Sequence, residues 1–149
     1  MAVGGLATVL HGHARLTADI ELVVDLEPSE ALRAMQALSD LGLRPRAPVQ
    51  ATEFSDPEKR RQWVEDKGMQ VFSFRDPGEP LLEVDVFVTH PIPFEELWQR
   101  SEEVRAGAVR IRIASIPDLV ALKRLAGRPE DLQDIEALEA ILEARHDDD

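Results

Sequence analysis

Cysteine is absent from this chain of 149 residues. The absence excludes disulfide bonds, thiolate catalysis and metal sites of the cysteine type. The sequence also lacks any apolar run near the roughly 20 residues of a membrane-spanning helix. Its N-terminus does not show the charged-then-apolar layout of a secretory signal peptide. Low-complexity tracts and internal repeats are not evident. We therefore expect a cytoplasmic protein that does not enter a membrane.

Basic residues are in short supply: 17 Lys and Arg stand against 29 Asp and Glu, so the net charge is −12. This balance argues against broad, non-specific binding of nucleic acid, which needs a basic surface. Two local groups could still form a basic groove, namely Lys59-Arg60-Arg61 and the set Arg100, Arg105, Arg110 and Arg112. The alternative is that both groups lie on solvated helix and strand faces.

The length is sufficient for one domain with a hydrophobic core, so residues 1–149 are treated as a single domain. Proline, glycine and capping residues predict helices over 6–13, 28–41, 57–67, 93–101, 115–126 and 129–144. Alternation predicts strands over 19–25, 69–75 and 81–88, and a hairpin over 104–114. Residues 43–52 fit either a loop or an edge strand. The expected fold class is α+β, a mixed sheet with helices packed on it, and the acidic tail 145–149 is expected to be disordered.

Carboxylates interrupt two of the predicted strands. Asp19 and Glu21 are two residues apart and would point to the same side of a strand. Asp85 lies in the middle of the apolar segment 81–88, where an isolated Asp is disfavoured. A divalent cation shared by the three acids would relieve their repulsion, because hard oxygen ligands suit Mg²⁺ or Mn²⁺. The alternative is a solvated strand end for the pair, and an edge strand whose Glu83 and Asp85 face water.

Together these motifs resemble a known family. A glycine pair (Gly4-Gly5), a short helix, the pattern Arg15-x-Thr17-x-Asp19-x-Glu21 and a later strand with Asp85 are similar to the nucleotidyltransferase superfamily of DNA polymerase β. The closer similarity is to small bacterial nucleotidyltransferases of the AbiEii toxin type. The C-terminal half resembles that group in Ser115-Ile116-Pro117-Asp118-Leu119-Val120-Ala121-Leu122-Lys123 and in Ala126-Gly127-Arg128-Pro129-Glu130-Asp131-Leu132-Gln133-Asp134-Ile135.

The resemblance implies a nucleotidyltransferase-like fold and catalysis with two Mg²⁺ (or Mn²⁺) ions. Asp19 and Glu21 match the first two ligand positions, and Asp85 matches the third and would also act as the base. The family more often has Asp where Glu21 stands. One ion would grip the phosphates and the other would activate the attacking hydroxyl. The glycine loop, Gly4 and Gly5, would let a triphosphate approach the backbone at the start of the following helix.

Three further residues, Arg15, Thr17 and Lys123, are candidate nucleotide contacts. Arg15 could bind a phosphate through two hydrogen bonds, or form an ion pair with Asp19 or Asp25. Thr17 could bind the same group or shape the turn.

By resemblance Lys123 would be a cation on the nucleotide side. Its alternative is a bridge to Asp131 or Asp134 across the turn between two helices, where Arg128, Asp131 and Asp134 are expected to form a structural network.

The histidines His11, His13 and His90 do not suggest a metal site, because His11 and His13 do not share a helix face. They are expected mostly at the surface or at the edge of the core.

The leading functional hypothesis is a Mg²⁺-dependent enzyme that moves a nucleoside monophosphate from an NTP to an acceptor hydroxyl. The resemblance points to RNA (a tRNA end) or a protein as the acceptor, and to the toxin of a toxin–antitoxin pair with an antitoxin protein as partner. The alternative is a non-catalytic module that keeps the fold for nucleotide binding or protein interaction. A third reading is an acidic structural partner whose exposed strand edges support a homodimer.

Overall fold

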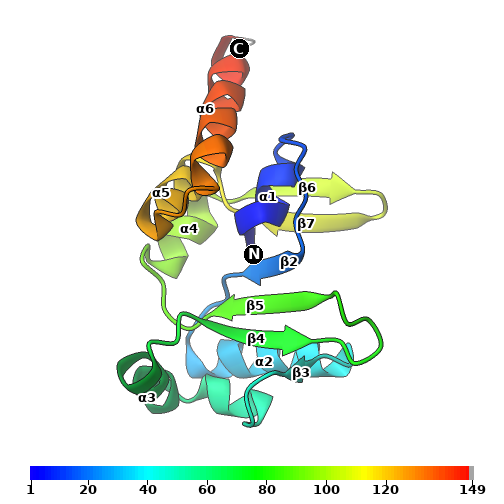
Figure 1. Cartoon of the computed structure of the whole chain (residues 1–149), viewed down its shortest axis with the longest axis vertical. Coiled ribbons are helices and arrows are strands. Elements are labelled where there is room, and N and C mark those ends of the chain that lie inside the picture. Colours follow the sequence, from blue (N-terminus) through cyan, green and yellow to red (C-terminus); the bar gives the residue numbers. More distant parts are fainter. Residues whose placement is uncertain (148–149) are drawn as a thin grey trace. The chain divides into compact units, whose positions relative to one another are not determined.

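Helices and strands alternate along the chain in the computed structural model, which describes residues 1–147 (Figure 1). The chain divides into two units, and each has its own strands and helices. Ala18–His90 form the central unit, and Met1–Thr17 with Pro91–Asp149 form the terminal unit. The predicted class of mixed helix and sheet is confirmed, and one domain over 1–149 stays a prediction. No helix within residues 1–147 is long and apolar enough to cross a bilayer.

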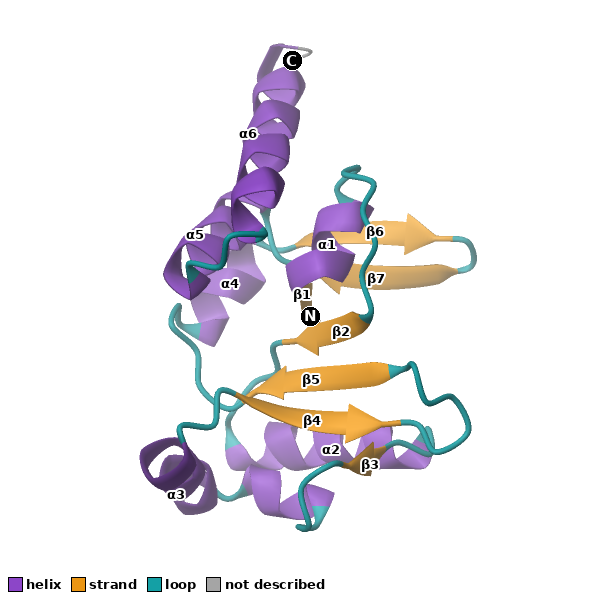
Figure 2. Cartoon of the chain, viewed as in Figure 1, coloured by secondary structure: helices purple, strands orange, loops and turns teal. Residues whose placement is uncertain are grey.

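Four strands form the sheet of the central unit, in the order β3-β4-β5-β2. They are β2 (Asp19–Leu22), β3 (Arg44–Pro45), β4 (Val71–Arg75) and β5 (Glu83–Phe87). β4 pairs with both β3 and β5 in antiparallel register, and β5 pairs with β2 in parallel. The hairpin of β4 and β5 is visible as two opposed arrows in Figure 2. The ambiguous segment 43–52 therefore begins as a two-residue edge strand and turns into a 3₁₀ helix.

Three helical segments accompany this sheet: α2 (Pro28–Asp40), η1 (Ala51–Ser55) and α3 (Pro57–Lys67). The starts of α2 and α3 follow from local chemistry, since the side chain of Glu27 accepts hydrogen bonds from the first turn of α2, and that of Asp56 does so for α3. Proline at the first helical position fits both starts. α3 ends at Gly68, whose φ of 61° lies in the left-handed region that glycine favours.

The core of the central unit lies on one face of its sheet. Phe72 and Phe74 on β4 are buried, and they pack with Phe54 and Trp63 from the helical segments. The Trp63 and Phe72 rings are stacked with centroids 5.2 Å apart, and Phe72 meets Phe74 edge-on at 5.3 Å. Ser73, which lies between the two buried phenylalanines, points to the other face, because side chains alternate along a strand.

The terminal unit contains three strands and four helices. Its elements are β1 (Ala2–Val3), α1 (Gly4–Leu10), α4 (Phe94–Arg100), β6 (Glu102–Ala106), β7 (Val109–Ile113), α5 (Ile116–Ala126) and α6 (Asp131–Asp147). β7 pairs in parallel with β1 and in antiparallel register with β6. The side chain of Ser115 caps α5 by accepting from the Asp118 backbone N–H at 3.3 Å.

The C-terminal helix is longer than its sequence indicates. α6 continues to Asp147, so residues 145–147 are helical and the prediction of a disordered tail from residue 145 is wrong for them. Arg145 on this helix binds Glu102 at 3.2 Å and His11 Nδ1 at 3.2 Å. These contacts are reasons for the helix to persist. Residues 148 and 149 lie outside the described part of the chain.

Candidate functional site

The candidate metal ligands lie on one face of the central sheet. Asp19 and Glu21 alternate with Ile20 and Leu22 on β2, and the two apolar residues pack against the core. On β5, Val84 and Val86 are buried in the same core, so Asp85 points to the opposite face. β2 and β5 are parallel neighbours with Glu21 directly beside Asp85. The structure therefore brings the three carboxylates Asp19, Glu21 and Asp85 to one side of two adjacent strands.

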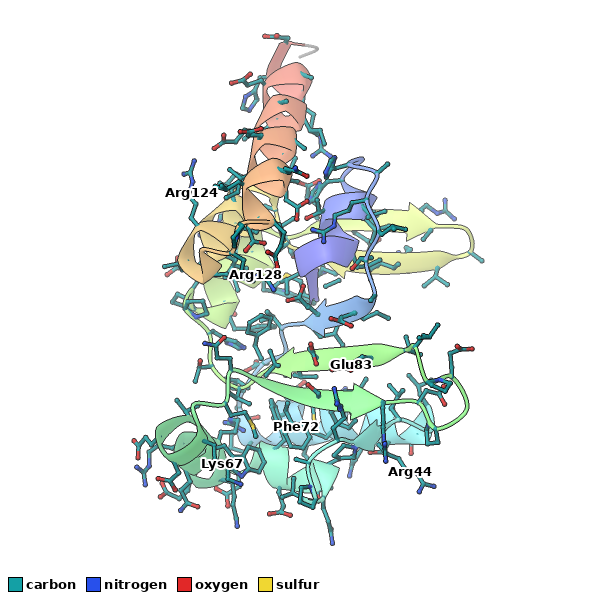
Figure 3. All side chains as sticks on the ribbon, viewed as in Figure 1. Arg44, Lys67, Phe72, Glu83, Arg124 and Arg128 are labelled. Carbon is teal, nitrogen blue, oxygen red and sulfur yellow. The ribbon has the colours of Figure 1, made fainter. Side chains whose placement is uncertain are left out.

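A fourth carboxylate stands in the same group, because Asp19 is paired in register with Glu83. Glu83, labelled in Figure 3, has both oxygens occupied by Arg46 Nη1 at 3.1 and 3.0 Å. This ion pair distinguishes Glu83 from Asp85, which Arg46 does not bind. Glu83 is thus engaged by the protein itself, and Asp85 is the better placed of the two for a cation.

The surroundings of Asp85 disfavour the ionised form of its carboxyl. Burial is the main cause that raises the pKa of the Asp85 carboxyl, and the neighbouring charges of Glu83 and Asp19 raise it further. A hydrogen bond from Ser73 Oγ to Asp85 Oδ1, at 2.5 Å, acts in the opposite direction, as does the charge of Arg46. The hydrogen bond engages Oδ1 and orients the carboxylate. A bound cation would favour the ionised form in the same way.

The donor chemistry of this face fits a divalent cation. Within residues 1–147 no three His, Asp or Glu side chains already converge closely enough to hold an ion. The carboxylates instead lie on neighbouring strands, which are spaced by about 4.8 Å, and rotation about their side-chain bonds can bring their oxygens to one point. Carboxylate oxygens are the ligands that Mg²⁺ and Mn²⁺ prefer. Asp19, Glu21 and Asp85 are therefore the residues that would hold such an ion.

Gly4 and Gly5 begin helix α1 in the terminal unit. Gly4 has a φ of 62°, in the left-handed region that side chains disfavour. A Cβ on Gly5 would lie 2.5 Å from Thr17 Oγ1, so only glycine permits the observed approach of Thr17. These observations give both glycines and Thr17 a structural role in the loop. Contact of the three residues with a triphosphate stays a prediction.

Lys123 and Arg15 share a carboxylate partner, also in the terminal unit. The buried Lys123 Nζ donates to Asp134 Oδ2 at 2.7 Å and to Asp131 Oδ1 at 3.4 Å. Arg15 Nη1 binds the same oxygen of Asp134. This geometry matches the structural alternative for Lys123. The alternative for Arg15, an ion pair with Asp19 or Asp25, is wrong as to the partner, which is Asp134; contact of Arg15 with a phosphate stays a prediction.

The network extends to neighbouring residues. Arg128 Nε donates to Asp131 Oδ2 at 3.0 Å, and His13 Nε2 lies 3.6 Å from Asp134 Oδ1. His11 is buried, and its Nε2 hydrogen-bonds the Ala114 carbonyl at 2.8 Å. Burial lowers the pKa of His90, in the central unit. His11 and His13 thus have structural partners in the terminal unit, and His11 is more deeply buried than the surface or core-edge position expected for it.

The two candidate basic groups are largely neutralised. Arg60 is buried and donates to the backbone carbonyls of Leu26 and Phe54. Its neighbours bind glutamates, with Lys59 on Glu53 and Arg61 on Glu58 and Glu65. In the second group Arg100 binds Asp118, whereas Arg110 and Arg112 both meet Glu103. Among these cations Arg60 and Arg105 have no ion pair within residues 1–147, and of the two only Arg60 is held by backbone carbonyls.

Sequence reasoning missed Ser73 and Arg46. Ser73 is a small polar residue between two buried phenylalanines, and this alternation already indicates that it faces away from the core. Nothing in the sequence indicates that it lies opposite Asp85, because that depends on the register of β4 and β5. Arg46 follows a proline in a segment that fits either a loop or an edge strand, so nothing in the sequence indicates its pairing with Glu83.

No protein-family model matches this sequence, and no curated protein matches it either. Membership of the nucleotidyltransferase superfamily therefore stays a prediction, carried by the motifs and by the grouping of acids in the central unit.

Proposed function

We propose that the chain is a divalent-metal-dependent nucleotidyltransferase that moves a nucleoside monophosphate from an NTP to an acceptor hydroxyl. The observation that carries the proposal is the register of β2 with β5, which sets Glu21 beside Asp85 on the face opposite the core. Four carboxylates on one sheet face repel one another. This repulsion lowers the stability of the sheet, and a bound cation would remove it.

The reaction joins the acceptor oxygen to the α-phosphorus and breaks the bond between the α-phosphorus and the bridging oxygen to the β-phosphate, so pyrophosphate leaves. When bound, the divalent ions supply positive charge to the phosphates and lower the pKa of the acceptor hydroxyl. Asp19, Glu21 and Asp85 would contribute oxygen ligands to such ions, and Asp85 would also accept the hydroxyl proton. Ser73 holds Asp85 Oδ1, which leaves Oδ2 free of that hydrogen bond.

The test is incubation of the protein with labelled NTPs, Mg²⁺ and total cellular RNA or protein. We expect label to enter one of the two pools and pyrophosphate to be released. Asp85→Asn should lower the rate by about 10²-fold or more, because it removes both a ligand and the base. Glu79→Gln is the matched control: it removes one exposed negative charge from the same unit and from a turn that carries no ion pair within residues 1–147.

Two results would contradict the proposal. One is transfer that persists in Asp85→Asn at the rate of the Glu79→Gln control. The other is Mg²⁺-dependent NTP binding without pyrophosphate release from any acceptor pool, which would favour the non-catalytic module. Calorimetry with Mg²⁺ and each NTP, with Asp19→Ala beside the unchanged protein, detects that second case.

A further inference from the structure

The face that carries the acids also carries arginines, on its other half. Register places Arg75 on β4 opposite Glu83 on β5, and Arg44 on β3 opposite Arg75. Directly paired residues of antiparallel strands point to the same side. Since Asp19 pairs with Glu83, one row across the four strands reads Asp19, Glu83, Arg75, Arg44. The sheet face is acidic on β2 and β5 and basic on β4 and β3.

Arg44 and Arg75 lie directly opposite each other on neighbouring strands. Both are exposed, and within residues 1–147 neither has a hydrogen bond or ion pair through its side chain. The carboxylate nearest to Arg75 in register is Glu83, but Arg46 already occupies both oxygens of Glu83. Arg75 is therefore left without the partner that its position would otherwise give it.

Two like charges directly opposite each other on paired strands destabilise a sheet. Edge strands commonly tolerate a charge because it faces water, yet here two guanidinium groups share one position on neighbouring strands. An anion between them would relieve the repulsion. Phosphate suits such a pair best, because guanidinium groups bind its oxygens through paired hydrogen bonds.

We propose that Arg44 and Arg75 form a phosphate-binding site beside the carboxylates. The row places Arg75 one strand from Glu83 and two strands from Asp19, or roughly 10 Å at a strand spacing of about 4.8 Å. A phosphate held there belongs either to the NTP or to the backbone of a single-stranded nucleic acid whose end reaches Asp85. Which of the two it is rests on the proposed function, whereas phosphate binding itself does not.

The probes are a labelled single-stranded RNA of twelve nucleotides and ATP, each titrated in EDTA at low salt by fluorescence anisotropy or calorimetry. Arg44→Gln and Arg75→Gln are each expected to weaken one of the probes by about tenfold, and more together. Loss of this phosphate contact should also reduce the slope of the salt dependence of RNA binding by about 0.7. Circular dichroism checks that each variant folds.

Arg105→Gln is the control, since Arg105 is exposed and itself forms no ion pair within residues 1–147. Dependence of RNA alone on Arg44 and Arg75 identifies a backbone phosphate, and dependence of ATP alone identifies the triphosphate; both support the site. The site is disproved if neither probe depends on the two arginines, or if Arg105→Gln weakens binding equally. Failure of the proposed function is seen separately, as absence of transfer while the arginine-dependent binding persists.

Discussion

Asp85 carries a charge that its position in the fold disfavours. Its pKa is raised above the usual value mainly by burial, so the ionised carboxylate is less favourable in the folded chain than in the unfolded chain. The Ser73 hydroxyl offsets only part of this effect. Such a residue persists at a cost to stability, which is typical of a position kept for chemistry.

At the residue scale we predict that Asp85→Asn stabilises the fold while it lowers the rate of transfer. At pH 7 without divalent ions, the free energy of unfolding should rise, by less than about 1 kcal/mol because partial exposure screens the charge. Because the pKa of Asp85 is raised in the folded chain, its ionised carboxylate lowers the free energy of unfolding fully only at pH values above that pKa. The difference should therefore vanish as the pH falls below about 3.9, the ordinary value for Asp.

Urea unfolding at pH 7 and at pH 3 measures this change, and the Asn side chain can still accept from Ser73. A variant that is less stable than the unchanged protein at pH 7 would contradict the prediction.

At the element scale, α5 and α6 are joined through buried charge. Asp134 on α6 forms ion pairs with Lys123 of α5 and with Arg15 of the loop after α1. Asp131 forms ion pairs with Lys123 and Arg128. Removing one partner of a buried pair leaves the other charge buried without full compensation. The stability lost on replacing a residue of this network therefore depends on how many buried partners are left without a counter-charge.

We predict that Asp134→Asn is more destabilising than Lys123→Met. The first leaves the buried Lys123 ammonium with Asp131 alone and should cost about 3 kcal/mol. The second leaves Asp131 with Arg128 and Asp134 with Arg15, so its cost should be smaller. Denaturant unfolding of both variants gives the order. Equal losses, or the reverse order, would show that Lys123 does more than balance the two aspartates.

Much of this arrangement of elements was predictable from the sequence. Pro28, Asp56, Ser115 and Gly127 fix helix ends through capping chemistry that acts within a few residues. Apolar alternation on β4 and β5 likewise reveals which face each residue occupies. Local signals of this kind are readable because they need no knowledge of the rest of the fold.

Partners from distant parts of the chain were not predictable. Arg15 binds Asp134 and Arg46 binds Glu83, and neither pairing has a local signal. Both depend on how the strands and helices come together. The proposed nucleotide role of Lys123 likewise came from motif position, and the structure surrounds this residue with aspartates.

At the scale of the whole molecule, the proposed ligands all belong to the central unit. The terminal unit contains Lys123, Arg15 and the glycine pair. A ligand that binds only the folded form stabilises the part of the molecule that holds it. Hydrogen exchange resolves such local effects, because segments open with different free energies.

We predict that Mg²⁺ slows amide exchange in β2 and β5 and leaves α5 and α6 unchanged. At 100 times the dissociation constant the gain in protection should approach about 2.7 kcal/mol where exchange follows unfolding of the central unit. Exchange followed by mass spectrometry measures both units in one sample. Asp19→Asn should abolish the effect. Equal protection in both units, or none in either, would contradict binding at the carboxylates.

The alternation on β2 has a consequence for how the chain finds its alignment. A shift of this strand by one residue against β5 would turn Asp19 and Glu21 toward Phe72 and Phe74, and expose Ile20 and Leu22. Burying ionised groups in that apolar layer is energetically unfavourable, so a strand paired in the wrong register would dissociate from the sheet. The acids that we assign to chemistry thus also serve as a check on correct assembly, and replacing several of them at once with apolar residues would remove it.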